Sequence, residues 1–287
     1  MTACREESIV ANGLAHHVLR WGEGPTDVVL CHGFLDVGWS FDALARVLAG
    51  KGYGVAAFDW RGHGESEWIG AGGYYHFPDY VLDLEYLLPQ LSDRPIHLVG
   101  HSMGGGICAM YASARPDKLQ TLTLIEGIGP PDAGERNAVE RLKVWLDGVH
   151  KRREDTPRSM KDTSEALKRM RIQNPELTDE LGLFLASKST KSAPDGGLTW
   201  SFDPLHRTWS PRPFNAEQFS MVLAAIETPT LVVAGERGYR LPDQAERLAH
   251  LQSYELAEIS DVGHMVHWFQ PDELGAALVS FFGTHSA

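Results

Sequence analysis

A serine placed between two glycines is the residue with the clearest chemical potential in this sequence. The pattern G-H-S-M-G at 100–104 has Ser102 at its centre, follows the apolar run 96–100 and precedes a helix-like pattern at 107–114. On a sharp turn from strand to helix, a serine hydroxyl projects above the edge of a sheet, where it can act as a nucleophile. The plainer interpretation is a serine that only caps the helix.

A serine hydroxyl needs a general base, and histidine is the side chain most often used. The chain holds 13 histidines, so residue type alone selects none of them. His264 lies in a loop at 260–264, directly after a strand-like segment at 254–259. His267 is the competing candidate three residues further on, and we expect it to pack beside Trp268.

The segments around these residues alternate between strand-like and helix-like patterns. Two short strands within 7–21 turn at Asn12-Gly13, where a hairpin turn is favoured. The later strands are apolar on both faces, which is typical of a parallel sheet covered by helices on both sides. The sequence predicts these strands within the apolar run 28–34 and at 55–59, 96–100, 122–126, 229–235 and 254–259, with helices around 41–48, 81–91, 107–114, 242–251 and 271–282.

The stretch 127–225 has a different character, with basic runs at 151–153 and 168–171 and a Trp/Pro-rich part at 198–213. A structureless loop of this length inside a compact domain is implausible, so we expect a mostly helical insertion. Its aromatic residues suggest an apolar pocket lining, although such residues more often form a core. They are Trp145, Phe184, Trp200, Phe202 and Trp209.

Composition narrows the class of protein. Among 287 residues, Lys+Arg number 26 and Asp+Glu 38, so the net charge of −12 argues against a partner that is nucleic acid or an anionic membrane. The three cysteines suggest neither a disulfide framework nor a zinc cluster, and no phosphate-binding glycine motif follows a strand. No apolar signal core or membrane-spanning stretch is visible. We therefore expect a cytoplasmic protein without metal or cofactor.

Several motifs in the same order make the chain similar to the α/β-hydrolase superfamily. They are His32-Gly33-Phe34, Asp59 with the run 61–66, the G-H-S-M-G-G-G pattern and Gly263-His264. The resemblance implies an α/β-hydrolase fold, with a mostly parallel central sheet flanked by helices. It implies a core at 1–126 and 226–287, and a helical cap at 127–225.

The same resemblance assigns candidate roles to individual residues. It implies Ser102 as nucleophile and His264 as base, with the backbone N–H groups of Phe34 and Met103 as an oxyanion hole. Asp59 and Ser66 also match family positions, and we interpret them as structural residues that hold the glycine-rich turn.

The acid that orients the histidine departs from the usual family pattern. Many members carry aspartate after the seventh strand, where this chain has Gly238. Some relatives, including a subset of haloalkane dehalogenases, place the acid after the sixth strand, which ends here in Glu126. We favour Glu126, because the triad needs a carboxylate to fix the histidine tautomer. Asp243 and Glu236 are the alternatives.

These residues predict a serine hydrolase that acts on a small acyl substrate. The bond cleaved would be a carboxylic ester, or else a thioester, lactone or amide, through an acyl-enzyme on Ser102. Serine at this position excludes haloalkane dehalogenase and epoxide hydrolase chemistry, since those relatives use aspartate there. A C–C hydrolase, a lyase, a perhydrolase and a receptor-like binding protein remain alternatives. The sequence leaves homo-oligomerisation open.

Overall fold

The computed structural model describes residues 3–132, 137–155 and 159–285, and its centre is one large sheet. Within these ranges the strand order is β1-β2-β4-β3-β5-β6-β9-β10. The first two strands form an antiparallel hairpin and β2 runs antiparallel to β4, while every other neighbouring pair is parallel. The strands are β1 (Arg5–Ala11), β2 (Leu14–Trp21), β3 (Val28–Cys31), β4 (Val55–Phe58), β5 (Ile96–His101), β6 (Leu119–Ile125), β9 (Thr230–Gly235) and β10 (Tyr254–Ile259).

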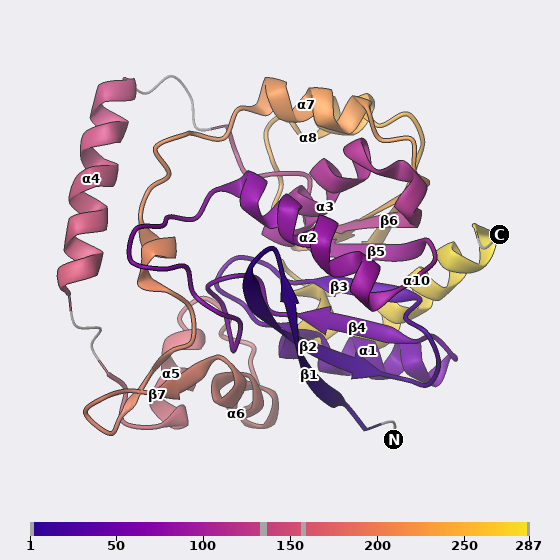
Figure 1. The fold of residues 1–287 in the computed structure, drawn as a ribbon. Helices are drawn as coiled ribbons and strands as arrows, with labels where there is room; N and C mark the ends of the chain where they lie inside the picture. The colour runs from indigo at the N-terminus through magenta and orange to yellow at the C-terminus, as the bar shows by residue number, and fades with distance from the viewer. Residues whose placement is uncertain (1–2, 133–136, 156–158, 286–287) are drawn as a thin grey trace.

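Helices cover both faces of this sheet, as the doubly apolar strands predicted (Figure 1). One face packs against α1 (Asp42–Gly50) and α10 (Pro271–Thr284) in a single buried cluster. The other face packs against α2 (Phe77–Leu91), α3 (Met103–Ala114) and α8 (Gln244–His250). The predicted mostly parallel sheet flanked by helices is therefore confirmed. No helix in the described ranges is long and apolar enough to cross a membrane.

The insertion at 127–225 carries its own short elements between β6 and β9. Helices α5 and α6 pack on each other and on α9, which directly follows the loop of His264. Helix α4 stands apart from the sheet (Figure 1), whereas α7 packs into the cluster that contains α3. The division into core and cap at these boundaries stays a prediction. The elements are α4 (Ala138–Glu154), α5 (Thr163–Met170), α6 (Asp179–Lys188), β7 (Thr190–Ser192), β8 (Leu198–Trp200), α7 (Ala216–Ala224) and α9 (Val266–Phe269).

A buried aromatic stack joins the insertion to the loop after β4. The ring of His206 lies between His63 and Tyr75, with centroid distances of 4.2 and 3.9 Å. The Tyr75 hydroxyl donates to Asp203 Oδ2 at 2.8 Å, and the Asp203 N–H donates to the Gly62 carbonyl at 2.8 Å. Burial lowers the pKa of His206 to about 3, so the stacked ring is neutral at physiological pH.

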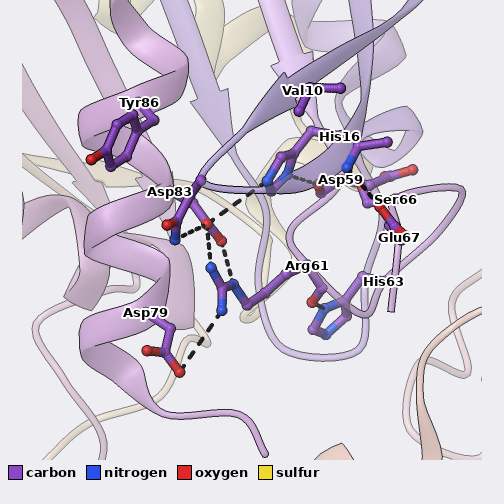
Figure 2. A network of polar contacts seen from close by, with 12 residues as sticks. Val10, His16, Asp59, Arg61, His63, Ser66, Glu67, Asp79, Asp83 and Tyr86 are labelled. Carbon is purple, nitrogen blue, oxygen red and sulfur yellow. Dashed lines mark hydrogen bonds and ion pairs between the residues drawn. The ribbon is translucent and has the colours of Figure 1, made fainter. Parts of the chain in front are cut away.

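A buried ion pair anchors the same loop to α2 (Figure 2). Arg61 Nε and Nη2 donate to the two carboxylate oxygens of Asp83 at 2.6 and 2.5 Å. Asn12 Nδ2 also donates to Asp83 Oδ1, at 3.0 Å, which ties in the turn of the β1–β2 hairpin. Because Asp83 is fully buried, these bonds must offset the cost of removing its charge from water.

Replacing Asp83 with alanine should destabilise the fold, because the buried Arg61 guanidinium would keep only the more exposed and more distant Asp79, 3.8 Å away, as a carboxylate partner. We expect a loss of about 3–5 kcal/mol in the free energy of unfolding, measured by urea titration. Glu140→Ala removes a partner from an exposed ion pair on α4 and is the control that should leave the midpoint close to that of the parent protein. Equal midpoints for the two variants would contradict this role of the Arg61–Asp83 pair.

Candidate active site

Ser102 lies at the turn between β5 and α3 in a conformation that non-glycine residues rarely adopt. Its φ and ψ are 52° and −116°. The turn is held by the Ser102 N–H, which donates to the Ile125 carbonyl at 2.9 Å. A Cβ atom at Gly104 would lie 2.4 Å from the Cys31 carbonyl oxygen, so only glycine lets α3 approach the end of β3 this closely. Strain of this kind persists only where the surrounding structure fixes the residue.

The segment after β3 carries the backbone amide of Phe34, which the sequence predicted as an oxyanion donor together with that of Met103. The buried His32 ring donates from Nδ1 to the Gly33 carbonyl at 2.8 Å and accepts at Nε2 from the Trp60 N–H at 3.0 Å. Burial lowers the pKa of His32, which favours the neutral ring that this bonding requires. Neither the Phe34 N–H nor the Met103 N–H donates to another described residue, and their role as an oxyanion hole stays a prediction.

Leu35, next to Phe34, is held in the left-handed region by a histidine of the neighbouring loop. Its φ is 59°, and its N–H donates to His63 Nε2 at 3.3 Å. His63 in turn belongs to the loop that Arg61 anchors. The bonds of His32 and His63 therefore fix the peptide groups on either side of Phe34.

His264 and Glu126 come from different strand ends and meet at this edge. Glu126 Oε2 lies 3.3 Å from His264 Nδ1, and the glutamate side chain is only 2% exposed. Its carboxylate also accepts from the Gly235 N–H at 2.9 Å and the Tyr239 N–H at 2.8 Å. With a proton on Nδ1 directed at Glu126, the other ring nitrogen of His264 carries the lone pair that a general base needs.

Gly238 makes room for that carboxylate. A Cβ atom built at Gly238 would lie 2.1 Å from Glu126 Oε1. The Glu126 carboxylate thus occupies the space that the Cβ atom of an acidic residue at 238 would need. The two positions compete for one volume, and this chain fills it from Glu126.

The other acidic candidates have different partners. Asp243 Oδ2 accepts from Arg247 Nε at 2.9 Å, and Glu236 Oε2 accepts from the Asp261 N–H at 2.8 Å. Among the described hydrogen bonds and ion pairs, neither carboxylate contacts His264. The geometry therefore brings only Glu126, of the three candidates, to the histidine.

Asp59, interpreted from the sequence as structural, holds the glycine-rich turn. Its carboxylate accepts from the Gly38 N–H at 2.6 Å and the Glu65 N–H at 3.0 Å. The Ser66 hydroxyl donates to the Asp59 carbonyl at 2.6 Å. Burial alone would raise the pKa of Asp59, but its hydrogen bond with His17 lowers it below the ordinary value. The carboxylate is therefore charged and fully used within the turn.

The loop of His264 is tied directly to the serine turn. His101 Nε2 donates to the His264 carbonyl at 2.9 Å, and the two rings are 4.7 Å apart. In the described residues no hydrogen bond joins the Ser102 hydroxyl to the His264 ring; such bonds are often long before substrate binds. The arrangement thus gathers a strained serine, a histidine with a carboxylate partner and two unused amides.

Comparison with known proteins places this geometry in a family. The model of the alpha/beta hydrolase fold matches residues 27–271. The chain belongs to this family. It is 25% identical over 280 residues to a serine hydrolase-like protein of Danio rerio, covering 93% of this chain and 84% of that one. It is 28% identical over 289 residues to a 3-hydroxybutyrate-oligomer hydrolase of Cupriavidus necator, covering 94% and 93%.

The likeness to a solved structure covers nearly the whole chain. A thioesterase domain from the curacin biosynthetic pathway superposes with a TM-score of 0.85 at 30% identity, covering 96% of this chain and 99% of that one. Family membership, relatives with hydrolase names and this superposition together identify the protein as a hydrolase of the α/β-hydrolase fold.

The aromatic residues of the insertion do not share one location in this hydrolase. Phe184 meets Trp39 edge to face, and Trp200 stacks on Phe202. Trp145 lines a hollow of about 400 Å³ together with residues 72–74 and 76, and Trp209 is 52% exposed. None of their described ring contacts involves Ser102 or His264. A lining role for these side chains stays a prediction.

One group of polar side chains near the serine was not visible in the sequence. Asp36, His101 and His267 are widely separated along the chain, yet each has a potential metal-ligand atom within 4.8 Å of those of the other two. His267 does pack against Trp268, with ring centroids 6.0 Å apart, and it also packs against Phe41 at 4.5 Å. No spacing pattern could have revealed this group, because only the fold brings its members together.

Gly238→Ala should disturb the histidine without altering any polar side chain. The added methyl group would displace the Glu126 carboxylate, so His264 would lose its fixed tautomer. The ¹⁵N shifts of the His264 ring report that tautomer and should change. Gly70→Ala is the matched control, since a Cβ atom there meets nothing within 4 Å. An unaltered His264 spectrum in Gly238→Ala would contradict the shared space that we describe.

Proposed function

We propose that this protein is a serine hydrolase that cleaves carboxylic esters or thioesters through an acyl-enzyme on Ser102. The observation that carries the proposal is the contact between His264 Nδ1 and the buried Glu126 carboxylate, in a loop bonded to the residue that precedes Ser102. A serine, a histidine and a carboxylate in this relation form the constellation that activates a hydroxyl for acyl transfer.

In the first half of the reaction, Ser102 Oγ attacks the acyl carbon while His264 Nε2 takes the hydroxyl proton. The carbonyl oxygen becomes negatively charged, and the N–H groups of Phe34 and Met103 donate to it. Each such donor is worth about 10²–10³ in turnover in comparable sites. The bond to the alcohol or thiol then breaks, and the histidine returns its proton to that leaving group.

In the second half, a water molecule replaces the leaving group beside His264. The histidine takes a proton from the water, whose oxygen attacks the acyl-serine carbonyl. The serine is then released with the proton from His264, and the carboxylic acid leaves. Throughout both halves Glu126 holds the proton on Nδ1 and stabilises the positive ring. No other group is needed to balance the reaction.

The relatives support the class of bond rather than one substrate. One is named a hydrolase of 3-hydroxybutyrate oligomers and another a thioesterase domain. Both names fit acyl transfer to water. The segment 127–225 is in a position to act as the cap over the acyl group, since α5 and α6 pack against the helix that follows His264. We therefore propose a small acyl compound as the substrate.

Ser102→Ala should abolish turnover of short p-nitrophenyl esters and thioesters, because the nucleophile is lost. In a comparable triad the loss of the serine lowers kcat about 10⁶-fold. A fluorophosphonate probe should label the parent at Ser102 and leave the variant unlabelled, with circular dichroism showing that both are folded. Labelling at another serine, or no turnover by the parent across a panel of esters, thioesters, lactones and amides, would refute the proposal.

Glu126→Gln should lower turnover at saturating ester about 10⁴-fold, as in another triad in which the acid became an amide. Asp243→Asn and Glu236→Gln should change it far less, because those carboxylates contact Arg247 and the Asp261 amide. Collapse of activity in either control with a near-normal Glu126→Gln would place the acid elsewhere.

A paired substitution tests the shared space directly. Glu126→Ala should lose activity, and adding Gly238→Asp to it should restore part of the rate, since the truncated side chain vacates the volume that a Cβ at 238 requires. Gly238→Asp alone should be impaired, because it crowds two carboxylates together. If the paired variant were no faster than Glu126→Ala, the carboxylate at 238 would not be able to replace the one at 126.

A further inference from the structure

The group Asp36, His101 and His267 is the strongest unassigned feature of the described chain. The three residues come from the segment after β3, the end of β5 and helix α9, and their exposed fractions are 7%, 1% and 0%. A nitrogen or oxygen atom of each lies within 4.8 Å of the corresponding atoms of the other two. We call this group the Asp36–His101–His267 cluster.

Each member presents a buried polar atom with no hydrogen-bond partner among the described residues. These atoms are Asp36 Oδ2, His101 Nδ1 and His267 Nδ1. A buried polar atom without a partner is costly, so one such atom on each of three neighbouring residues calls for an explanation. Simple exposure to bulk water does not explain them, because each of the three atoms is itself buried.

The hydrogen bonds around the cluster show that two of its atoms, on His101 and Asp36, are acceptors. His101 uses its Nε2 proton to bond the His264 carbonyl, so its Nδ1 carries a lone pair. Asp36 Oδ1 accepts from the Val37 N–H at 2.9 Å, which leaves Oδ2 facing the cluster. Oδ2 lies 3.6 Å from His267 Nε2, too far for a normal hydrogen bond. His267 Nε2 is also 3.3 Å from the Ser40 hydroxyl.

Two imidazole nitrogens and a carboxylate oxygen suit a first-row divalent transition metal. Burial lowers the pKa of both His101 and His267, and the neutral ring is the form that binds a metal. A cation would also compensate the buried charge of Asp36. Bonds of about 2.0 Å to each ligand would hold the three residues together around the ion.

We propose that Asp36, His101 and His267 form a buried binding site for a divalent transition-metal ion of the Zn²⁺ type. The site is connected to every part of the candidate active site. His101 precedes Ser102 and bonds the His264 backbone, while Asp36 lies two residues after Phe34. A metal held by the three ligands would therefore act on the serine turn, the histidine loop and the oxyanion segment together. Resting on the proposed function, this predicts that Zn²⁺ slows ester turnover.

The decisive experiment uses the unaltered full chain and Zn²⁺ alone. Protein treated with a chelator is crystallised, soaked in Zn²⁺ and measured on both sides of the zinc absorption edge. We expect an anomalous peak about 2.0–2.2 Å from one atom of each cluster residue. Density that refines as water without anomalous signal would overturn the proposal. So would a peak only at His264 or at the more exposed group Glu6, His17 and Glu65.

Variants test the same site in solution by calorimetric titration with Zn²⁺. His267→Gln and Asp36→Asn should each weaken Zn²⁺ binding by more than about 100-fold, the upper cost of losing only an indirect metal contact. Glu6→Gln alters the more exposed group and should leave the high-affinity binding unchanged. Equal affinity in all three variants would refute the assignment.

Two features keep the result separate from the proposed function. If the cluster variants do not fold, as judged by circular dichroism, the diffraction experiment on the parent protein decides alone. Metal binding is read without any acyl substrate, so a chain that failed every turnover assay could still show the zinc peak. An active enzyme without the zinc peak would refute only the proposed metal site.

Discussion

The carboxylate of Glu126 is the contact on which the candidate site depends. Glu126 directly follows β6. Its carboxylate accepts from the N–H groups of Gly235, at the end of β9, and Tyr239, in the loop after β9, and it contacts His264 in the loop after β10. These three strands are neighbours and parallel, so their carboxyl ends lie at one edge of the sheet. The buried Glu126 carboxylate thus connects the segments that follow three neighbouring strands. That neighbourhood also explains how an acid from β6 can serve a histidine that other family members pair from the next strand.

Backbone strain is concentrated at the same edge. Five non-glycine residues in the described ranges have positive φ, and four of them follow strands β3, β5, β6 and β10. They are Leu35, Ser102, Glu126 and Asp261. Such conformations cost about 1–3 kcal/mol each, so neighbouring structure must compensate them. For Leu35, the bonds of His32 to Trp60, of His63 to Leu35 and of Arg61 to Asp83 provide this support through one loop.

Sequence patterns were reliable where burial is continuous. The runs at 55–59 and 96–100 became β4 and β5 within a residue or two, because strands covered on both faces consist mostly of apolar residues. The sequence patterns failed where their signal is weak. Strand β1 begins at Arg5, earlier than the apolar residues indicated, since it pairs on one side only and its first residues are exposed. Helix α9 has only four residues and went unnoticed.

The site itself was predictable in part, for a related reason. Ser102 and His264 lie in local motifs, and the conformation of a local turn is determined by adjacent residues. The clearance at Gly238 depends on where a side chain from β6 ends, which no neighbouring residue encodes. Likewise, the Asp36–His101–His267 cluster joins residues more than 60 positions apart, so its existence follows only from packing.

The exclusion between Glu126 and a side chain at 238 also limits how such a protein can change from one generation to the next. A lineage that gains an acid at 238 first must crowd two carboxylates into one volume, since a Cβ atom there lies 2.1 Å from Glu126 Oε1. A lineage that loses Glu126 first must pass through a form whose histidine has no counter-charge. With Glu126 as the acid of the triad, either order passes through a less active form, so single substitutions are expected to leave the acid on the strand that already holds it. The position of this carboxylate would then persist through descent by steric exclusion, without any advantage of one strand over the other.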